Sequence, residues 1–207
     1  VGAFSGCSLK EFNGKYASAD ARCLIIDGDL IAFAPAELTE YIVPKGVTSI
    51  RNCAFEGCSN LTTITIPEGV TEIGNAAFNS CSSLKTITIP EGVTSIGATA
   101  FSLCRSMTTI TIPESVTEIG NAAFKSCSSL ASITIPEGVT SIGSYAFEGC
   151  SSLTSITIPE SVAEIGNYTF SSCSSLTTIT IPEYITSIGV GAFSGCSLKE
   201  FNGKYAS

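Results

Sequence analysis

The sequence predicts a β-rich solenoid, a right-handed coil of short segments with a parallel β-sheet along one face. Two observations predict it. A 23-residue motif recurs seven times in register, with copies beginning at Leu38, Leu61, Leu84, Met107, Leu130, Leu153 and Leu176. Each copy opens with alternating apolar and polar residues and continues through a proline and a later glycine. One such coil cannot bury its apolar side chains alone, so the copies are expected to stack.

The copy at residues 61–83, LTTITIPEGVTEIGNAAFNSCSS, justifies each segment of the coil. Ile64 is expected to point inward and Thr63 and Thr65 outward on a short strand, because strand side chains alternate between faces and β-branched residues favour strands. Pro67 has no N–H and ends the strand. The apolar residues after the turn predict a second extended segment, and the Ala-Phe-x-x-Cys stretch closes the coil. No stretch has a helical period, so any helix is expected to be a single turn.

A longer duplication is superimposed on the repeats. Residues 1–18 are identical to residues 190–207, an offset of 189 residues, which indicates a segment of a longer tandem array or an engineered period of one. The whole chain, 1–207, is therefore expected to be one repeat array. We expect its parts to be the end of a preceding repeat (1–8), an elongated 29-residue coil with a hairpin (9–37), seven regular repeats (38–197) and the start of the next 189-residue unit (198–207).

The hairpin in the elongated coil is predicted from a turn signal. Asp27-Gly28 separates the apolar stretches Cys23–Ile26 and Asp29–Phe33, and Asp-Gly between two such stretches is typical of a two-residue hairpin turn. We expect this hairpin to project from the stack as a small flap.

Composition argues against several function classes. The net charge of −8, with only 10 Lys and Arg, disfavours a nucleic-acid partner. The longest apolar runs, such as Leu30–Ala36, are too short to cross a bilayer, so this segment is not expected to insert into a membrane. With no histidine and no phosphate-binding loop, the chain is expected to be neither an enzyme nor a cofactor-binding protein.

The ten cysteines are expected to be structural rather than a disulfide framework. Eight share one repeat position and should form a buried column of small apolar side chains: Cys7, Cys58, Cys81, Cys104, Cys127, Cys150, Cys173 and Cys196. The spacing of stacked coils, ~5 Å, would also permit some disulfides. Cys23 and Cys53 lie off the column and are the favoured pair if any disulfide exists. No metal site is expected, because histidine and C-x-x-C are absent.

The outward strand positions form a ladder of hydroxyl groups, the candidate binding residues. They are Thr63, Thr65, Thr86, Thr88, Thr109, Thr111, Ser132, Thr134, Ser155, Thr157, Thr178 and Thr180. One interpretation is that threonine is simply a good exposed strand residue; the other is a polar face that binds a protein or glycan. A third, more remote, is ice binding, which needs a flat sheet. Glu40 and Ile42 interrupt the ladder in the first regular repeat.

Two further surface features are candidates. A glutamate follows the proline in six repeats and predicts an acidic rim, which we interpret as a solvated edge, with a calcium ladder as the alternative: Glu68, Glu91, Glu114, Glu137, Glu160 and Glu183. Tyr145, Tyr168 and Tyr184 lie late in the sequence and could form a contact patch.

The pattern L-x-x-I-x-I-P-x-x-V-x-x-I-G-x-x-A-F-x-x-C-x-x resembles the BspA-like, treponemal-type class of leucine-rich repeats. The elongated segment, with RCLIIDGDL and FAPAELTEY, is similar to modules of surface proteins from gut Bacteroides. This resemblance implies a secreted or surface-exposed protein that adheres to host matrix proteins or to other cells, and it implies no catalytic residues.

The leading hypothesis is therefore an extracellular adhesion or ligand-binding array at a cell surface. Its expected partners are host extracellular-matrix or surface proteins, other cells and further copies of the same array. The alternative is a structural stalk or fibre built of 189-residue units, and ice binding is the third.

Overall fold

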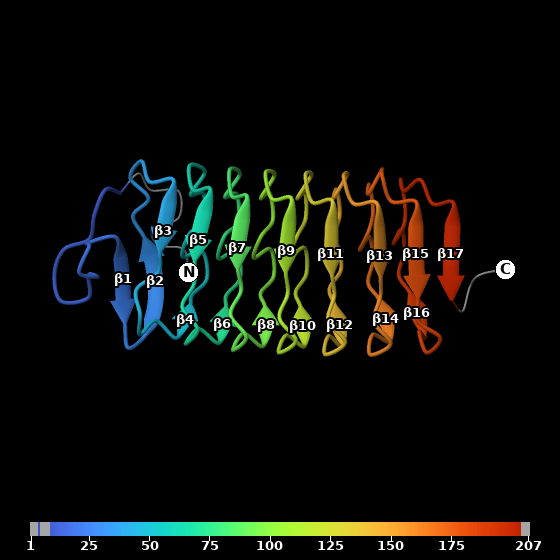
Figure 1. Cartoon of the computed structure of the whole chain (residues 1–207), viewed down its shortest axis with the longest axis horizontal. Helices are drawn as coiled ribbons and strands as arrows, with labels where there is room; N and C mark the ends of the chain where they lie inside the picture. Colours follow the sequence, from blue (N-terminus) through green and yellow to red (C-terminus); the bar gives the residue numbers. More distant parts are fainter. Residues whose placement is uncertain (1–3, 5–8, 204–207) are drawn as a thin grey trace.

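The computed structural model describes Phe4 and residues 9–203, and it is a β-solenoid in which successive coils stack along one axis (Figure 1). Each regular coil consists of a strand, a turn, a second shorter strand and a run of turns that leads to the next coil. The predicted fold class is confirmed. The expectations for residues 1–8 and 204–207 fall, apart from Phe4, outside the described residues.

The first strand of each coil carries the T-I-T or S-I-T sequence. These strands run parallel and in register, so that Ile64 lies beside Tyr41 and Ile87. They form a five-stranded sheet and a three-stranded sheet that follow one another along the axis. The first sheet contains β3 (Glu40–Ile42), β5 (Thr63–Thr65), β7 (Thr86–Thr88), β9 (Thr109–Thr111) and β11 (Ser132–Thr134), and the second contains β13 (Ser155–Thr157), β15 (Thr178–Ile181) and β17 (Glu200–Gly203).

The second strand of each coil forms a further sheet, which the sequence interpretation missed. It expected short extended segments opposite a single sheet, but these segments pair into the longest sheet of the molecule, with nine strands. Stacking explains this result, because once coils are in register their extended backbone groups need partners and find them in the next coil. The strands are β1 (Cys23–Ile26), β2 (Asp29–Phe33), β4 (Ser49–Ile50), β6 (Glu72–Ile73), β8 (Ser95–Ile96), β10 (Glu118–Ile119), β12 (Ser141–Ile142), β14 (Glu164–Ile165) and β16 (Ser187–Ile188).

The hairpin predicted around Asp27-Gly28 is present, but it does not project as a flap. β1 and β2 pair antiparallel, and β2 pairs in parallel with β4, with Asp29 beside Ser49. The hairpin therefore continues the nine-stranded sheet at its N-terminal end. Its outer edge is covered by the preceding residues, since the Ile25 N–H donates to the Tyr16 carbonyl at 2.7 Å.

The return segment of each coil contains no helix but has a distinctive backbone. Ala76 and Ser80 have positive φ values of 55° and 62°. Between them, alternate N–H groups donate to the following coil: Ala76 to Ala98 and Phe78 to Ala100, both at 2.8 Å. These hydrogen bonds stabilise a left-handed conformation that costs free energy for residues other than glycine.

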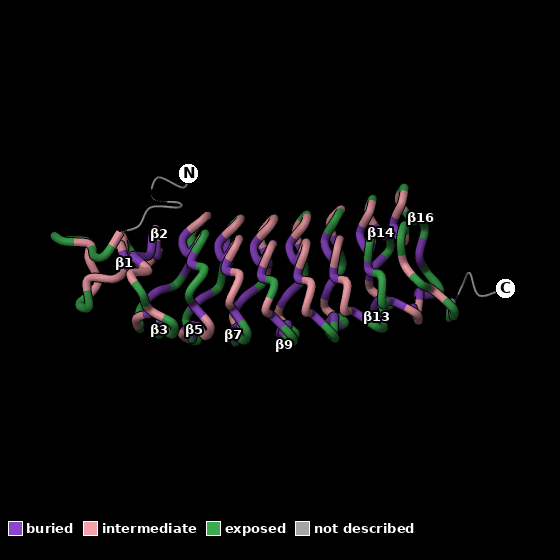
Figure 2. The backbone as a smooth tube through the Cα atoms, turned by 90° about the horizontal axis from the view of Figure 1, so that it is seen from above, coloured by how far each residue is buried: buried purple, intermediate pink, exposed green. Residues whose placement is uncertain are grey.

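Buried residues recur at equivalent positions of successive coils, as the purple parts of the tube show in Figure 2, and their side chains form columns along the stack. The phenylalanines from Phe55 to Phe193 stack with ring centroids 5.1–5.7 Å apart. Leucine, valine and isoleucine columns flank them, and most of these side chains are fully buried. Each ring from Phe78 to Phe170 contacts its equivalents in both neighbouring coils, so the core is continuous along the array.

The sequence Glu-Phe-Asn-Gly occurs twice and adopts two structures. At residues 200–203 it forms β17, with Glu200 beside Thr178 in β15. At residues 11–14 it forms no strand. At residues 200–203, pairing with β15 supplies the backbone partners of the strand.

Candidate functional site

The twelve candidate hydroxyl residues lie on the outer side of the first strands, where the structure brings them into rows. Register pairs place Thr63 beside Thr86 and Thr65 beside Thr88, and the same pairing recurs between β9 and β11 and between β13 and β15. The inward isoleucine between each pair is buried. The rows are interrupted between β11 and β13, where the ladder of paired strands breaks.

The hydroxyl groups of these twelve residues are not committed to the protein. None of them makes a side-chain hydrogen bond within the described part of the chain, whereas the neighbouring Thr62 and Thr177 hydroxyls donate to carbonyls of the preceding coil at 2.9 and 3.3 Å. At the N-terminal end of the face, Glu40 is exposed and Ile42 is 74% exposed. The face thus offers free donors and acceptors bordered by one exposed apolar side chain.

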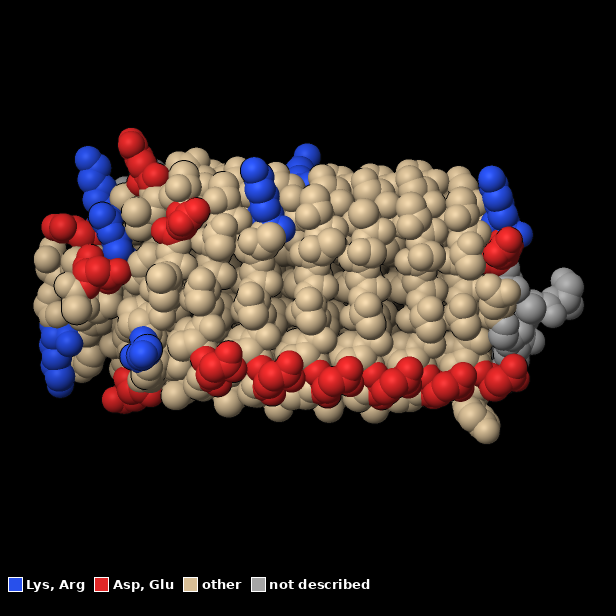
Figure 3. Space-filling view, viewed as in Figure 1, with Lys and Arg blue, Asp and Glu red and all other residues tan. Residues whose placement is uncertain are grey.

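The predicted acidic rim occupies the turns between the two strands of each coil. Figure 3 shows a line of acidic side chains along the lower edge of the solenoid, where these turns lie. Within the described residues, no group of three or more Cys, Asp or Glu side chains is placed to hold a metal ion. The calcium alternative therefore gains no support from the arrangement.

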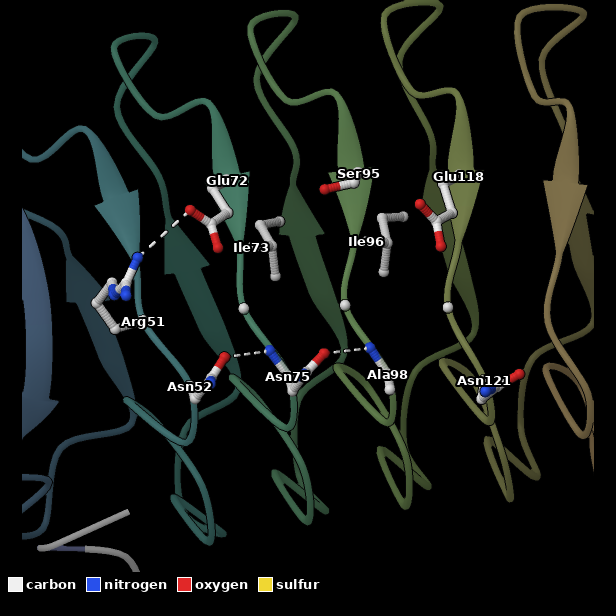
Figure 4. Close-up of a pocket in the computed structure, with 13 residues that line it drawn as sticks. Arg51, Asn52, Glu72, Ile73, Asn75, Ser95, Ile96, Ala98, Glu118 and Asn121 are labelled. Carbon is white, nitrogen blue, oxygen red and sulfur yellow. Dashed lines mark hydrogen bonds and ion pairs between the residues drawn. The ribbon is translucent and has the colours of Figure 1, made fainter. Parts of the chain in front are cut away.

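A shallow groove on the outer side of the nine-stranded sheet is a feature that the sequence interpretation did not identify. It has a volume of about 380 Å³ in the coils from Arg51 to Asn121, and Figure 4 shows its walls. One wall carries Glu72, Ser95 and Glu118, and the other carries an asparagine or alanine from each coil. The 46-residue alternation of glutamate and serine is visible in the sequence, but it does not reveal that a groove lies beside it.

Glycine forms the floor of the groove because the coils approach too closely for a side chain. A Cβ atom on Gly97 would lie 2.6 Å from the Gly74 carbonyl carbon, and one on Gly120 would lie 2.6 Å from the Ala98 nitrogen. At the N-terminal end, the Arg51 guanidinium lies 3.5 Å from Glu72. Glu118 makes no ion pair in the described part of the chain and is exposed.

The column cysteines lie in the core, with the exception of the half-buried Cys196. Their thiols donate to phenylalanine carbonyls of the preceding coil, for example Cys127 to Phe101 at 3.1 Å. Burial raises the pKa of this thiol to about 12 and raises the pKa of its neighbours Cys104 and Cys150 well above the usual range. These thiols are therefore protonated and unreactive at neutral pH. The described members are Cys58, Cys81, Cys104, Cys127, Cys150, Cys173 and Cys196, and Cys7 lies outside the described residues.

Cys23 and Cys53, the favoured disulfide pair, are both free thiols. Cys23 is buried, and its sulfur lies 3.1 Å from the Tyr41 hydroxyl, which donates to Asp20 at 3.0 Å. Burial raises the pKa of Cys23 to about 12. This cluster lies at the N-terminal end of the described core. Its thiol is protonated at neutral pH and is therefore not a reactive nucleophile.

The structure brings together only two of the three candidate tyrosines. The Tyr145 and Tyr168 rings stack at 5.2 Å, and the Lys125 ammonium lies 5.5 Å from the Tyr145 ring centre and 2.7 Å from Glu148. Tyr184 lies in the turn between β15 and β16, makes no ring contact with them and is 76% exposed. Tyr145 and Tyr168 therefore stack on each other between neighbouring coils, and the expected patch of three tyrosines is not formed.

Comparisons with known proteins agree with this architecture. The family model described as BspA type leucine rich repeat region, with six copies, matches residues 30–127 and 94–205. The leucine-rich repeat protein of T. pallidum is 30% identical, with a TM-score of 0.80, and the match covers 96% of this chain and all of that one. No curated protein matches the chain.

Two further solved structures resemble the chain. A leucine-rich repeat protein from Bacteroides ovatus is 36% identical, with a TM-score of 0.78 over 83% of this chain. One from Eubacterium ventriosum is 27% identical, with a TM-score of 0.80 over 98%. The chain spans 45% and 58% of these two proteins. Leucine-rich repeat solenoids of this kind are typically binding scaffolds, and the described residues include no helix long and apolar enough for a transmembrane span. From the repeat, the stacked coils and these matches, we conclude that the chain belongs to the BspA-type leucine-rich repeat family.

Proposed function

We propose that this chain is part of a non-enzymatic adhesion or ligand-binding array outside the cell, and that the hydroxyl rows of β5 to β15 are its docking face. The observation that carries the proposal is the set of twelve hydroxyl groups that are aligned by strand pairing yet uncommitted to internal hydrogen bonds. Threonine hydroxyls both donate and accept, so such rows suit a protein or glycan surface.

The chemistry of the central column thiols supports a non-enzymatic role. The sequence has no histidine, and burial raises the pKa of the central column thiols, which keeps them protonated. The same burial makes free cysteines tolerable in an oxidising exterior, because a protonated, inaccessible thiol reacts slowly with oxidants. Extracellular location is thus compatible with the buried thiols of the column.

The partners that we propose are host extracellular-matrix or surface proteins, other cells and further copies of the array. The test is a pull-down on immobilised matrix proteins and glycans with the double variant Thr109→Lys/Thr111→Lys. Two lysines at the centre of the face should abolish binding. The matched control, Thr117→Lys/Thr140→Lys, adds the same charge at exposed positions outside the rows and should bind as the unaltered chain does. Equal binding by both variants would show that the rows are scaffold.

A structural stalk is the second candidate function, and the 189-residue duplication favours it. Identical units add length without adding new binding sites. The start of the next 189-residue unit pairs with the last regular coil through β17 and β15. A chain of two full units distinguishes the candidates. Binding that strengthens with unit number supports a multivalent adhesin, whereas no binding by a rigid rod of doubled length, measured by X-ray scattering, supports a stalk.

A further inference from the structure

The asparagine wall of the groove contains one backbone donor that has no hydrogen-bond partner within the described residues, the N–H of Asn121. The Asn52 side-chain oxygen accepts from the Asn75 N–H at 2.7 Å, and the Asn75 oxygen accepts from the Ala98 N–H at 2.8 Å. Ala98 has no such oxygen, and the N–H of Asn121 makes no hydrogen bond within the described part of the chain. Ala98 and Asn121 both line the groove, so this donor belongs to its wall.

The same arrangement recurs two coils later, on the sheet face beyond the residues that line the groove. The Asn121 oxygen accepts from the Ser144 N–H at 2.9 Å, but Ser144 makes no corresponding bond to Asn167, whose N–H is again unpaired within the described residues. The coils that hold these free donors also carry Glu118 and Glu164, whereas the coils between them carry serine at that position. A free donor and an exposed carboxylate therefore occur together in one coil and again two coils later. At the ~4.8 Å spacing of paired strands, the two occurrences are about 9.6 Å apart along the stack.

We propose that the C-terminal end of this groove, together with the sheet face that continues from it to Glu164 and Asn167, binds an extended basic protein segment in the polyproline II conformation, with a cationic side chain at every third residue. This inference rests on the proposed binding function, but it assigns a different face of the solenoid and a defined partner chemistry. Lysine or arginine side chains pair with Glu118 and Glu164, and the backbone carbonyls of the segment accept from the Asn121 and Asn167 N–H groups.

The spacing selects this conformation over the other regular ones. Polyproline II has three residues per turn and a ~3.1 Å rise, so equivalent side chains recur every ~9.3 Å, which follows the two-coil period of about 9.6 Å. In a β-strand, side chains on one face recur every ~6.8 Å, so the second side chain already fails to match the two-coil period of the carboxylates. A helix has a suitable two-turn repeat, but its carbonyls are already hydrogen-bonded. Polyproline II carbonyls are free.

The shape and charge of the groove agree with this occupant. The lining glycines, Gly97 and Gly120, present backbone and no side chain to the groove. Among the described residues that line the groove, one is cationic: Arg51 lies at the N-terminal end and is paired with Glu72 and with Asp29 at 3.7 Å. The carboxylates farther along are available to a cationic partner.

The experiment measures fluorescence anisotropy of a labelled 15-residue peptide of Pro-Pro-Lys repeats at low ionic strength, with the intact chain. Binding should be lost when the lysines are replaced by glutamine, and it should weaken when the same number of lysines stands at every second residue. The variant Glu118→Gln/Glu164→Gln should bind about tenfold more weakly, since two partly exposed ion pairs contribute up to ~1.4 kcal/mol together. The matched control, Glu114→Gln/Glu160→Gln, removes the same charge from the same two coils on the acidic rim and should change affinity by less than about twofold.

A second variant tests the backbone donors without changing charge. Ala98→Asn/Ser144→Asn supplies the missing side-chain oxygens to the Asn121 and Asn167 N–H groups. It should raise the thermal midpoint of unfolding slightly and weaken peptide binding several-fold. Unchanged peptide affinity together with a raised midpoint would show that these donors do not contact the ligand and would overturn the assignment.

Other outcomes separate this inference from the proposed function. If matrix proteins bind through the hydroxyl face while the peptide fails to bind, the groove assignment is wrong and the proposed function stands. If a β-1,4-linked glucose hexasaccharide binds instead, and the variant Ala98→Asn/Ser144→Asn does not bind it, the groove is a glycan site and the assignment to a basic segment is wrong. Equal loss of peptide binding in the groove and rim variants would indicate non-specific attraction to an acidic protein.

Discussion

The glycine floor of the groove gives the sharpest test of the stacked geometry. Replacing Gly120 by alanine places a methyl group 2.6 Å from the Ala98 nitrogen, 2.7 Å from the Gly97 carbonyl carbon and 2.9 Å from the Ile96 carbonyl oxygen. All three atoms belong to backbone, which cannot rotate away as the end of a flexible side chain would. The two coils must therefore separate locally.

The expected cost follows from two contributions. Forcing an extra methyl group into a packed site costs about 1–3 kcal/mol. The separation also stretches the hydrogen bond from the Gly120 N–H to the Ile96 carbonyl, now 2.8 Å long, and a weakened hydrogen bond of this kind costs about 1 kcal/mol. We expect the free energy of unfolding to fall by about 2–4 kcal/mol in total.

The control is Gly69→Ala, in a turn where the nearest atom to the new Cβ is the Val47 carbonyl oxygen at an ordinary 3.5 Å. That change should be neutral or stabilise by up to ~1 kcal/mol, because alanine restricts the unfolded chain. Urea unfolding, monitored by circular dichroism, measures the stability of both variants. The urea concentration at the unfolding midpoint is compared, provided that the dependence of the unfolding free energy on urea concentration is unchanged. A Gly120→Ala midpoint equal to that of Gly69→Ala would refute the close approach of the coils.

Three further predictions concern the core. Phe101→Ala removes one ring from the stack and should lower the free energy of unfolding by about 3–5 kcal/mol in the same titration; a loss below about 1 kcal/mol would contradict the continuous column. Unfolded thiols ionise above about pH 8.5, while buried Cys104, Cys127 and Cys150 stay protonated because burial raises each pKa, to about 12 for Cys127. The contribution of these thiols to the free energy of unfolding is therefore fully present below pH ~8.5 and is lost as pH rises toward 12. Each thiol lowers the free energy of unfolding by ~1.4 kcal/mol per pH unit in this range, or ~4 kcal/mol per pH unit for the three. An alkaline titration in which the circular dichroism signal stays flat to pH 11 would contradict this prediction. In native-state thiol labelling at pH 8, half-buried Cys196 should react before the fully buried column members, and rapid labelling of Cys127 would refute the packing.

Much of the coil follows from residue order. The T-I-T alternation placed Thr63 and Thr65 outward and Ile64 inward, because strand side chains alternate, and the structure has this pattern. The Asp27-Gly28 turn likewise predicted the hairpin. The second sheet was missed because Glu72–Ile73 is two residues long, and so short a segment has no periodicity that distinguishes a strand from a loop.

The candidate site was predictable only in part. The hydroxyl rows are visible in the sequence, since each row is a fixed repeat position. The groove was not, because it depends on three positions of one coil, such as Glu118, Gly120 and Asn121, lying beside their equivalents in the preceding coil. The unpaired Asn121 N–H is a consequence of Ala98, 23 residues earlier, and only the stacking of the coils relates the two.

By itself, the sequence determined the repeat length, the inward and outward positions and the acidic, histidine-free composition, because these depend on residue identity and local stereochemistry. The tertiary structure decided which segments pair and where the surface is hollow. Backbone hydrogen bonds in this molecule are mostly made between coils, so a segment takes its final form only when a neighbouring coil supplies the partner.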